Sequence, residues 1–280
     1  MRHRILLLLG LFLVTFLPAL AQDAPSAMVA IPGGGFFMGT TPEEIAQAVN
    51  ECLLRDGGAC QPQSEDDSLP QAAMMVSPFQ LEISEATLAQ YAAFLNRLGA
   101  GSHRSACNGQ LCALTLDESD EALLLRNGVY EIIEGEFNAS AAMTHVSWYG
   151  AVAYCESIGR RLPSEVEWEF AARAGDTRIY PWGDTWDGAS FLNQSQLHPY
   201  GLDAMAGSVA EWVADWYARD AHSQRAAGQL GSEGPSAGLT KVVRGSWDPP
   251  LPFYFRTTQR KAHTPGGTAA WIGFRCAAGA

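Results

Sequence analysis

The chain has 280 residues, of which 47% are hydrophobic and 10% aromatic, and its formal net charge at pH 7 is −12. This is enough apolar sequence for one large or two small compact domains. Because an acidic protein is repelled by phosphate backbones and anionic lipid, we expect no nucleic-acid partner and no binding to an anionic membrane surface.

The first 21 residues have the parts of a secretory signal peptide. Basic residues precede an apolar run from Ile5 to Leu17, and an Ala-Leu-Ala cleavage site follows. We therefore predict export, to the periplasm or outside the cell, with residues 1–21 removed and residues 22–27 as a leader. The alternative is an uncleaved anchor, although the run is at the short end for a bilayer span. We expect no membrane span in the mature chain.

Six cysteines follow this signal: Cys52, Cys60, Cys107, Cys112, Cys155 and Cys276. An even number in an exported chain predicts disulfides. The first two flank a short glycine-containing loop, and so do the middle two, so each pair forms a local link and the last two are left for each other. A metal cluster is the alternative, but no Cys-x-x-Cys or His/Cys pairing supports it.

Hydrophobic periodicity and turn residues predict the elements in chain order. We expect two short strands around a glycine turn over 28–40, helices over 42–56 and from 84 to 98, strands over 75–83 and 130–133, a helix over 147–158, and a helix after residue 164. Thr41 with Pro42 starts the first helix, and Ser164 with Glu167 forms a capping box. The remainder is loop-rich, with many Trp and Gly, which indicates an irregular α+β domain.

Six phrases occur in a fixed order along the chain: IPGGGFFMGT, THVSWYGAVAYCESIGRRLPSEVEWEFAARAG, YPWGD, GLDAMAGSVAEWVADWY, VVRGSW and GFRCA. Together they resemble the formylglycine-generating enzyme (sulfatase-modifying factor) family over residues 28–276. The resemblance implies a loop-rich α+β fold, a variant of the C-type lectin fold, in a single domain over 28–280. It also implies a disulfide between Cys155 and Cys276, in agreement with the cysteine count.

Family members with known chemistry oxidise a cysteine of an unfolded sulfatase to formylglycine, using copper and oxygen. The resemblance implies that two cysteines after the glycine-serine turn hold the copper, but this segment has no cysteine here. Alignment back from GFRCA places Pro252 at one of the two positions and about Pro249 at the other. Copper(I) prefers thiolates, and the nearest remaining donor, Asp248, is a hard oxygen ligand. We therefore expect no copper.

The family also binds calcium near its Gly-x-x-x-Glu-Trp phrase. The resemblance implies Glu211 as the acidic ligand, with the carbonyls of Gly207 and Val209 and with Asp203 beside a further ligand position. Asn193 matches the start of a second family site, whose loop is shortened here. Calcium takes six or more oxygens. The alternative for Glu211 is a carboxylate on a helix face that bonds to nearby backbone.

The predicted site is the segment RGSWDPPLPFYFR over residues 244–256 and the residues that follow it. We expect a rigid apolar ligand-binding surface with arginines suited to a carboxylate, made of Trp247, Phe253, Phe255, Arg256 and Arg260. The candidate catalytic groups are Ser246, Asp248 and Tyr254. The alternative for Ser246 is a bond within its own turn, and for Arg275 an internal salt bridge.

Three functions follow from these observations. The first, which we favour, is an exported binding or accessory module for a small molecule, peptide or protein. The second is a non-copper enzyme of the same family, for oxidative tailoring of a peptide or siderophore. The third is formylglycine generation, which would need Cys107 and Cys112 as free thiols.

Overall fold

The structure is a computed structural model that describes residues 24–56, 58, 60, 66–119, 122–133, 138–245 and 251–280. The predicted signal peptide lies outside these residues, as do the candidates Ser246, Trp247 and Asp248. The described elements are, in chain order, β1 (Met28–Ile31), β2 (Gly34–Met38), α1 (Pro42–Asp56), η3 (Asp66–Ser68), β3 (Ala72–Val76), β4 (Phe79–Glu82), α2 (Leu88–Leu98), η4 (Ser102–Arg104), β5 (Leu123–Arg126), β6 (Val129–Ile132), α3 (Trp148–Ser157), α4 (Glu165–Ala172), α5 (Gly188–Leu192), α6 (Gln194–Leu197), β7 (Ala210–Trp216), α7 (Ala221–Ala226), β8 (Lys241–Arg244), η5 (Pro252–Phe255), β9 (Arg260–His263), β10 (Ile272–Gly273) and β11 (Ala277–Gly279).

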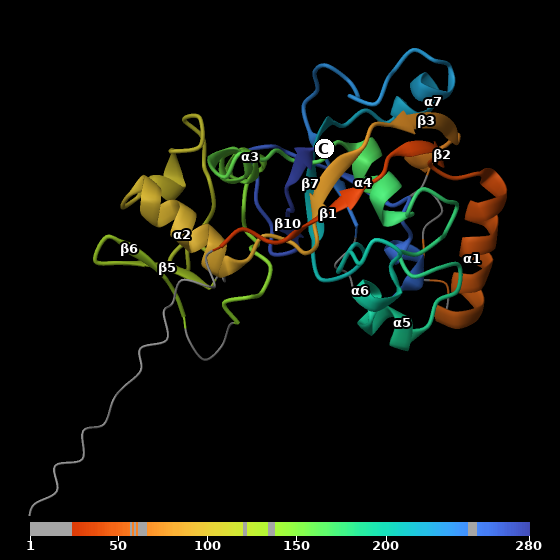
Figure 1. The fold of residues 1–280 in the computed structure, drawn as a ribbon. Coiled ribbons are helices and arrows are strands. Elements are labelled where there is room, and N and C mark those ends of the chain that lie inside the picture. The colour runs from red at the N-terminus through yellow and green to blue at the C-terminus, as the bar shows by residue number, and fades with distance from the viewer. Residues whose placement is uncertain are drawn as a thin grey trace, which may run out of the picture.

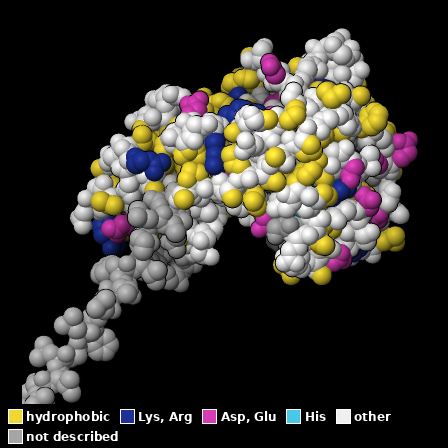
Figure 2. Space-filling model, viewed as in Figure 1, with side chains coloured by type: hydrophobic (Ala, Val, Ile, Leu, Met, Phe, Trp, Pro, Cys, Tyr) yellow, Lys and Arg dark blue, Asp and Glu magenta, His cyan; other side chains and the backbone are white. Residues whose placement is uncertain are grey.

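Two lobes flank a central region that contains β7 and β10 (Figure 1). One lobe carries α2, α3 and the β5–β6 hairpin, and the other carries α1, α4 and the β2–β3 pair. Each lobe has its own buried apolar cluster, one around Tyr91, Tyr154 and Phe274 and the other around Trp168 and Phe170. Carboxylates gather on the surface over α1, as Figure 2 shows. This mixed, irregular architecture confirms the predicted α+β class.

A three-stranded sheet joins the two ends of the described chain. Strand β4 lies at its centre, with β1 and β11 antiparallel on either side, so that Phe79 faces both Ile31 and Gly279. Cys155 on α3 is disulfide-bonded to Cys276, one residue before β11, with their Cα atoms 5.6 Å apart. The pairs Cys52–Cys60 and Cys107–Cys112 are also bonded. The three predicted pairings are therefore confirmed.

A four-stranded sheet in the order β10-β7-β8-β9 forms the centre of the molecule. Strand β10 runs parallel to β7, and the other pairs are antiparallel. The register places Glu211, Arg244 and Arg260 directly opposite one another on three adjacent strands. Side chains opposite one another in a sheet lie on the same face. The sheet therefore presents a row of buried charges to one side.

Capping residues and turn residues in the sequence predicted several of the element boundaries. The first helix begins at Pro42 as predicted, and the hydroxyl of Thr41 accepts from the backbone N–H of Glu44 at 3.1 Å. The predicted strand 75–83 was wrong, because residues 77 and 78 interrupt it and separate β3 from β4. The helix expected from residue 84 begins only at Leu88, where Thr87 forms a capping box. In the part of the chain that the structure describes, no helix is long and apolar enough to cross a bilayer.

The Cys155–Cys276 bond closes a loop with a sequence separation of 121 residues, whereas Cys107–Cys112 has a separation of 5. In the chain-entropy model, removing the long link costs about 5 kcal/mol and removing the short one about 2 kcal/mol. We therefore expect the C155A/C276A variant to lose clearly more free energy of unfolding than the C107A/C112A variant. Urea unfolding of both beside the wild type measures this, and equal losses would contradict it.

Candidate functional site

Helix α4 presents two carboxylates to the interior. Ser164 caps its first turn, since its hydroxyl accepts from the backbone N–H of Glu167, whose carboxylate accepts from the N–H of Ser164 in return. This cap fixes where the helix begins, and Glu165 and Glu169, four residues apart, then share one face. Both side chains are almost fully buried.

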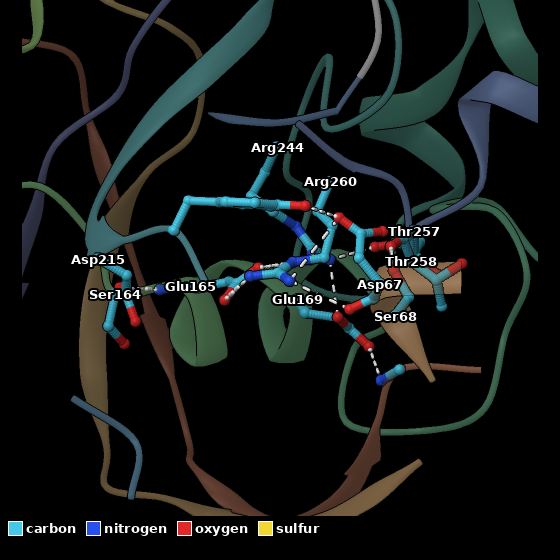
Figure 3. Close-up of polar contacts among 12 residues, drawn as sticks. Asp67, Ser68, Ser164, Glu165, Glu169, Asp215, Arg244, Thr257, Thr258 and Arg260 are labelled. Atoms are coloured by element: carbon cyan, nitrogen blue, oxygen red, sulfur yellow. Dashed lines mark hydrogen bonds and ion pairs between the residues drawn. The ribbon is translucent and has the colours of Figure 1, made fainter. Parts of the chain in front are cut away.

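Arginines from the central sheet meet these carboxylates (Figure 3). Arg244 donates from its two terminal nitrogens to Glu165 Oε1 at 3.1 Å and to Glu169 Oε2 at 2.7 Å. Arg260 forms a two-pronged contact with Glu165, from Nε to Oε1 at 2.7 Å and from Nη2 to Oε2 at 3.1 Å. Arg225 on α7 adds a third contact to Glu165 at 3.1 Å. One carboxylate thus joins α4, α7, β8 and β9.

The charges in this cluster depend on one another. Burial alone would raise the pKa of Glu165, but the guanidinium groups of Arg260, Arg225 and Arg244 outweigh burial and hold that pKa well below its usual range. Glu169 behaves in the same way, held low by Arg244 and Arg173 against the effect of its burial. We assign the cluster a positioning role, because both carboxylates are buried and bonded to the surrounding arginines.

A cavity of about 290 Å³ opens beside this cluster, and we call it the Tyr217 pocket. It is lined by Asp67, Tyr217, Arg219, Tyr254, Gln259, Arg260, Lys261 and Ala262. Two residues predicted from the sequence, Tyr254 and Arg260, therefore meet here. Arg260 also donates to the backbone oxygens of Asp67 and Ala218, each at 3.1 Å, and so ties the pocket wall to the buried cluster.

A tyrosine and a carboxylate form the polar centre of the pocket. Tyr217 donates its hydroxyl to Asp67 Oδ2 at 2.7 Å, and the guanidinium of Arg260 lies 4.8 Å from the centre of the Tyr217 ring. Burial raises the pKa of Asp67, although Arg260 opposes the effect. Burial and the neighbouring Asp67 raise the pKa of Tyr217 to about 12. At neutral pH the tyrosine is therefore a hydrogen-bond donor. Of the two groups, Asp67 is better suited to exchange a proton with a bound molecule.

The other predicted contact residues are placed differently from our expectation of an exposed surface. Phe253 packs in a core cluster with Ala48, and Phe255 stacks on Trp186 with ring centres 5.4 Å apart. The two phenylalanines are only 1% and 3% exposed, so they anchor the segment to the body of the protein rather than facing a ligand. Arg256 is also buried and donates to the backbone oxygen of Glu44 at 3.0 Å.

Gln259 and the pair Asp67–Tyr217 were missed in the sequence. Asp67 lies in what reads as a polar loop, and Tyr217 ends a phrase that carries no catalytic spacing. Only the folding of η3 against the end of β7 brings them together. The roles proposed for Ser246, Trp247 and Asp248 fall on residues outside the described ranges and stay predictions.

Glu211, the acidic calcium ligand expected from the resemblance, forms a buried ion pair with Arg275. Arg275 donates to both carboxylate oxygens of Glu211 at 2.7–3.0 Å, and Trp168 donates to Oε2 at 2.9 Å. The internal salt bridge expected for Arg275 is thus present. Glu211 lies on strand β7, so its alternative as a helix-face carboxylate was wrong. A cation at Glu211 would have to displace this guanidinium, and the donor set in this arrangement does not fit calcium.

The remaining expected calcium ligands lie around this ion pair or on a separate helix end. The backbone oxygen of Asp203 accepts from Arg275 at 2.8 Å. Gly207 adopts a left-handed conformation, with a φ of 90°, and Val209 is buried. Asn193 caps the end of α5, where its side chain donates to the backbone oxygen of Ala189 at 2.7 Å. Calcium binding at the second family position, which begins at Asn193, remains a prediction.

A family model and two curated relatives match nearly the whole chain. The model described as Sulfatase-modifying factor enzyme 1-like domain matches residues 16–280. A formylglycine-generating enzyme of Thermomonospora curvata is 29% identical over 92% of this chain and 95% of its own length. An inactive C-alpha-formylglycine-generating enzyme 2 of Mus musculus is 28% identical over 93% of this chain and 87% of its own length.

The fold has a solved counterpart. The structure of PvdO from Pseudomonas aeruginosa matches 92% of this chain and 95% of that chain with a TM-score of 0.63, at 22% sequence identity. At this identity the likeness establishes the fold alone. It agrees with the formylglycine-generating-enzyme-like variant of the C-type lectin fold.

Replacing Glu165 with Gln leaves Arg244, Arg225 and Arg260 without their shared negative charge. Removing one partner of a buried ion pair costs about 3–5 kcal/mol, because the remaining charge is uncompensated. We expect E165Q to lose about 3 kcal/mol or more of the free energy of unfolding. The control is E131Q, whose exposed pair with Arg126 at 3.9 Å contributes less than about 1 kcal/mol. Urea denaturation measures both, and equal losses would refute the role of Glu165.

Proposed function

The chain belongs to the formylglycine-generating enzyme (sulfatase-modifying factor) family, and we propose that it is an exported binding or accessory domain rather than a copper-dependent formylglycine generator. Family membership supports the scaffold but not the chemistry. The chemistry depends on which side chains this chain offers at the place where the family holds copper. Export rests on the signal-peptide features of residues 1–21.

The observation that carries the proposal is the state of the cysteines. The chain has six cysteines, and the three disulfides use all of them. A copper(I) site of the family type needs two thiolates, and Pro252, at one of the two corresponding positions, begins the buried turn η5. Formylglycine generation through Cys107 and Cys112 would require that their disulfide first be reduced.

The Tyr217 pocket supports a ligand that combines an aromatic group with a negative charge. Tyr217 and Tyr254 offer ring surfaces, and Arg219 brings an exposed cation to the lining of a protein whose net charge is −12. The side chain of Arg219 is 69% exposed, and its nearest carboxylate, Asp66, lies 3.7 Å away, which is a weak surface pair. An aromatic carboxylate, free or at the end of a peptide, matches these groups.

A non-copper enzyme is the second candidate, and one observation favours it. Asp67 lines the pocket, is 7% exposed, and has a pKa raised by burial. A carboxylic acid with a raised pKa, oriented by Tyr217, is suited to proton transfer with a bound molecule. We favour binding over catalysis, because Arg260, the other charged group at the pocket's inner wall, is bonded to Glu165 and is not free to assist a reaction.

The absence of free thiols predicts no copper-dependent oxidation. The purified protein, supplied with copper and a thiol peptide of the sulfatase type, should consume no oxygen above the peptide-free background. The mass of the peptide should stay unchanged. The Thermomonospora curvata formylglycine-generating enzyme, assayed in parallel, is the positive control. Oxygen uptake with conversion of the peptide cysteine to an aldehyde would overturn the proposal.

Phenylacetate, an aromatic carboxylate, should bind the Tyr217 pocket. We expect saturable shifts in a protein-observed NMR titration, with binding weakened about tenfold in Arg219→Ala, since a charge-assisted contact contributes about 1.5 kcal/mol. The control variant is R126A, which removes an exposed cation on β5, far along the chain from the pocket residues. Equal affinity in wild type and Arg219→Ala would count against the pocket, and an equal loss in R126A would show that only general charge is involved.

A further inference from the structure

A second cavity, of about 580 Å³, shares no lining residue with the Tyr217 pocket. It lies between β3, the start of α4, the end of β7 and the segment 232–236. Its lining includes Ser164, Glu167, Asp215, Trp216, Glu233 and Lys241. We call it the Lys241 cavity, because this lysine is the group whose chemistry the proposed function leaves unused.

The amine of Lys241 is held between two indole rings. Its Nζ lies 3.9 Å from the centre of the Trp148 ring and 3.8 Å from that of Trp216. The two rings are 6.4 Å apart and inclined by 25°, so they stand on either side of the nitrogen. Trp148 is fixed by a hydrogen bond from its Nε1 to the backbone oxygen of Val213 at 2.9 Å. The two rings therefore hold the Lys241 nitrogen in one place, even though the lysine side chain is long and flexible.

Burial of the Lys241 amine disfavours the ammonium, whereas the two indole faces and Asp215 favour it. The hydrogen bond of Nζ goes to a backbone carbonyl, that of Ala214, at 2.8 Å, and the Lys241 side chain is buried. This burial lowers the pKa of Lys241 to about 8, with Asp215 acting in the opposite direction. At pH 8 about half of such amines are neutral, compared with less than about 1% for a lysine with an ordinary pKa of about 10.4.

The other charged groups of the cavity are partly neutralised by one another. Arg161 and Glu167 form a two-pronged pair with both distances 2.7 Å. The Asp215 carboxylate accepts from the backbone N–H of Glu165 at 2.6 Å, and burial raises its pKa to about 7. Glu233 contributes a further carboxylate to the lining. None of these groups supplies the close ion pair that would hold Lys241 as an ammonium.

We propose that Lys241 is a reactive amine that captures a small polar aldehyde or ketone in this cavity as a Schiff base. The nitrogen lone pair attacks the carbonyl carbon, and the proton lost from nitrogen moves to the former carbonyl oxygen to give a carbinolamine. This then loses water as the carbon–nitrogen double bond forms. No oxidant or reductant is consumed. Buried lysines with lowered basicity are suited to this reaction.

The cavity indicates a hydroxylated carbonyl compound rather than an apolar one. Four serines contribute to its lining: Ser77, Ser164, Ser232 and Ser236. Hydroxyl groups both donate and accept hydrogen bonds, as do the hydroxyls of a short sugar-like aldehyde. A ligand with hydroxyl groups next to its carbonyl can therefore bind these side chains while its carbonyl carbon lies at Nζ.

The chain contains only two lysines, Lys241 and Lys261, which makes the test direct. The folded protein is incubated with glyceraldehyde and sodium cyanoborohydride at pH 8, and the rate of labelling at each lysine is read from peptide masses. The reductant traps the imine and is not part of the proposed step. We expect Lys241 to be labelled about tenfold faster than Lys261 or more, with a rate that rises through pH 8 rather than pH 10.

Two variants keep the result interpretable. Lys241→Arg keeps a cation between the tryptophans but removes the nucleophile, and it should lose the fast label while retaining the near-UV circular dichroism of the fold. Lys261→Arg should leave the fast label unchanged. Labelling of Lys241 at or below the rate of Lys261, or only after unfolding in urea, would overturn the proposal and assign Lys241 a structural cation–π role.

Discussion

The interior of this protein depends on Glu165 and the three guanidinium groups that surround it. Arg244 and Arg260 lie directly opposite each other on adjacent strands, an arrangement that repels unless a negative charge lies between them. Glu165 supplies this charge from α4 and also reaches Arg225 on α7. The position of the helix over the sheet, and of η3 beside β9, follows from satisfying these buried charges.

This constraint stabilises the scaffold independently of the segment that corresponds to the family's copper site. The charges, the Ser164 cap and the Cys155–Cys276 link stabilise α4, the central sheet and the β4 sheet without any residue of the segment that holds copper in the family. In the same segment, Pro252 and Phe253 are buried and serve packing.

The two cavities use the edge of this framework in different ways. The Tyr217 pocket places a tyrosine–carboxylate pair and the exposed cation of Arg219 next to the buried cluster, which suits recognition of an organic anion. The Lys241 cavity places a buried amine between two tryptophans, with no carboxylate in a close ion pair with it among the described residues. Both lie near the end of β7, where Asp215 is buried and the next two residues, Trp216 and Tyr217, are partly exposed.

The sequence by itself determined the class of fold, the caps of α1 and α4, and the cysteine pairing, because these depend on local spacing, on an even count of cysteines and on phrases quoted in order. It did not determine which side chains of residues 253–260 face a ligand. Phe253 and Phe255 became core residues, and Arg260 was committed to Glu165, 95 residues away. Only the tertiary structure decides such matters, because burial and charge pairing arise between segments that no local pattern connects.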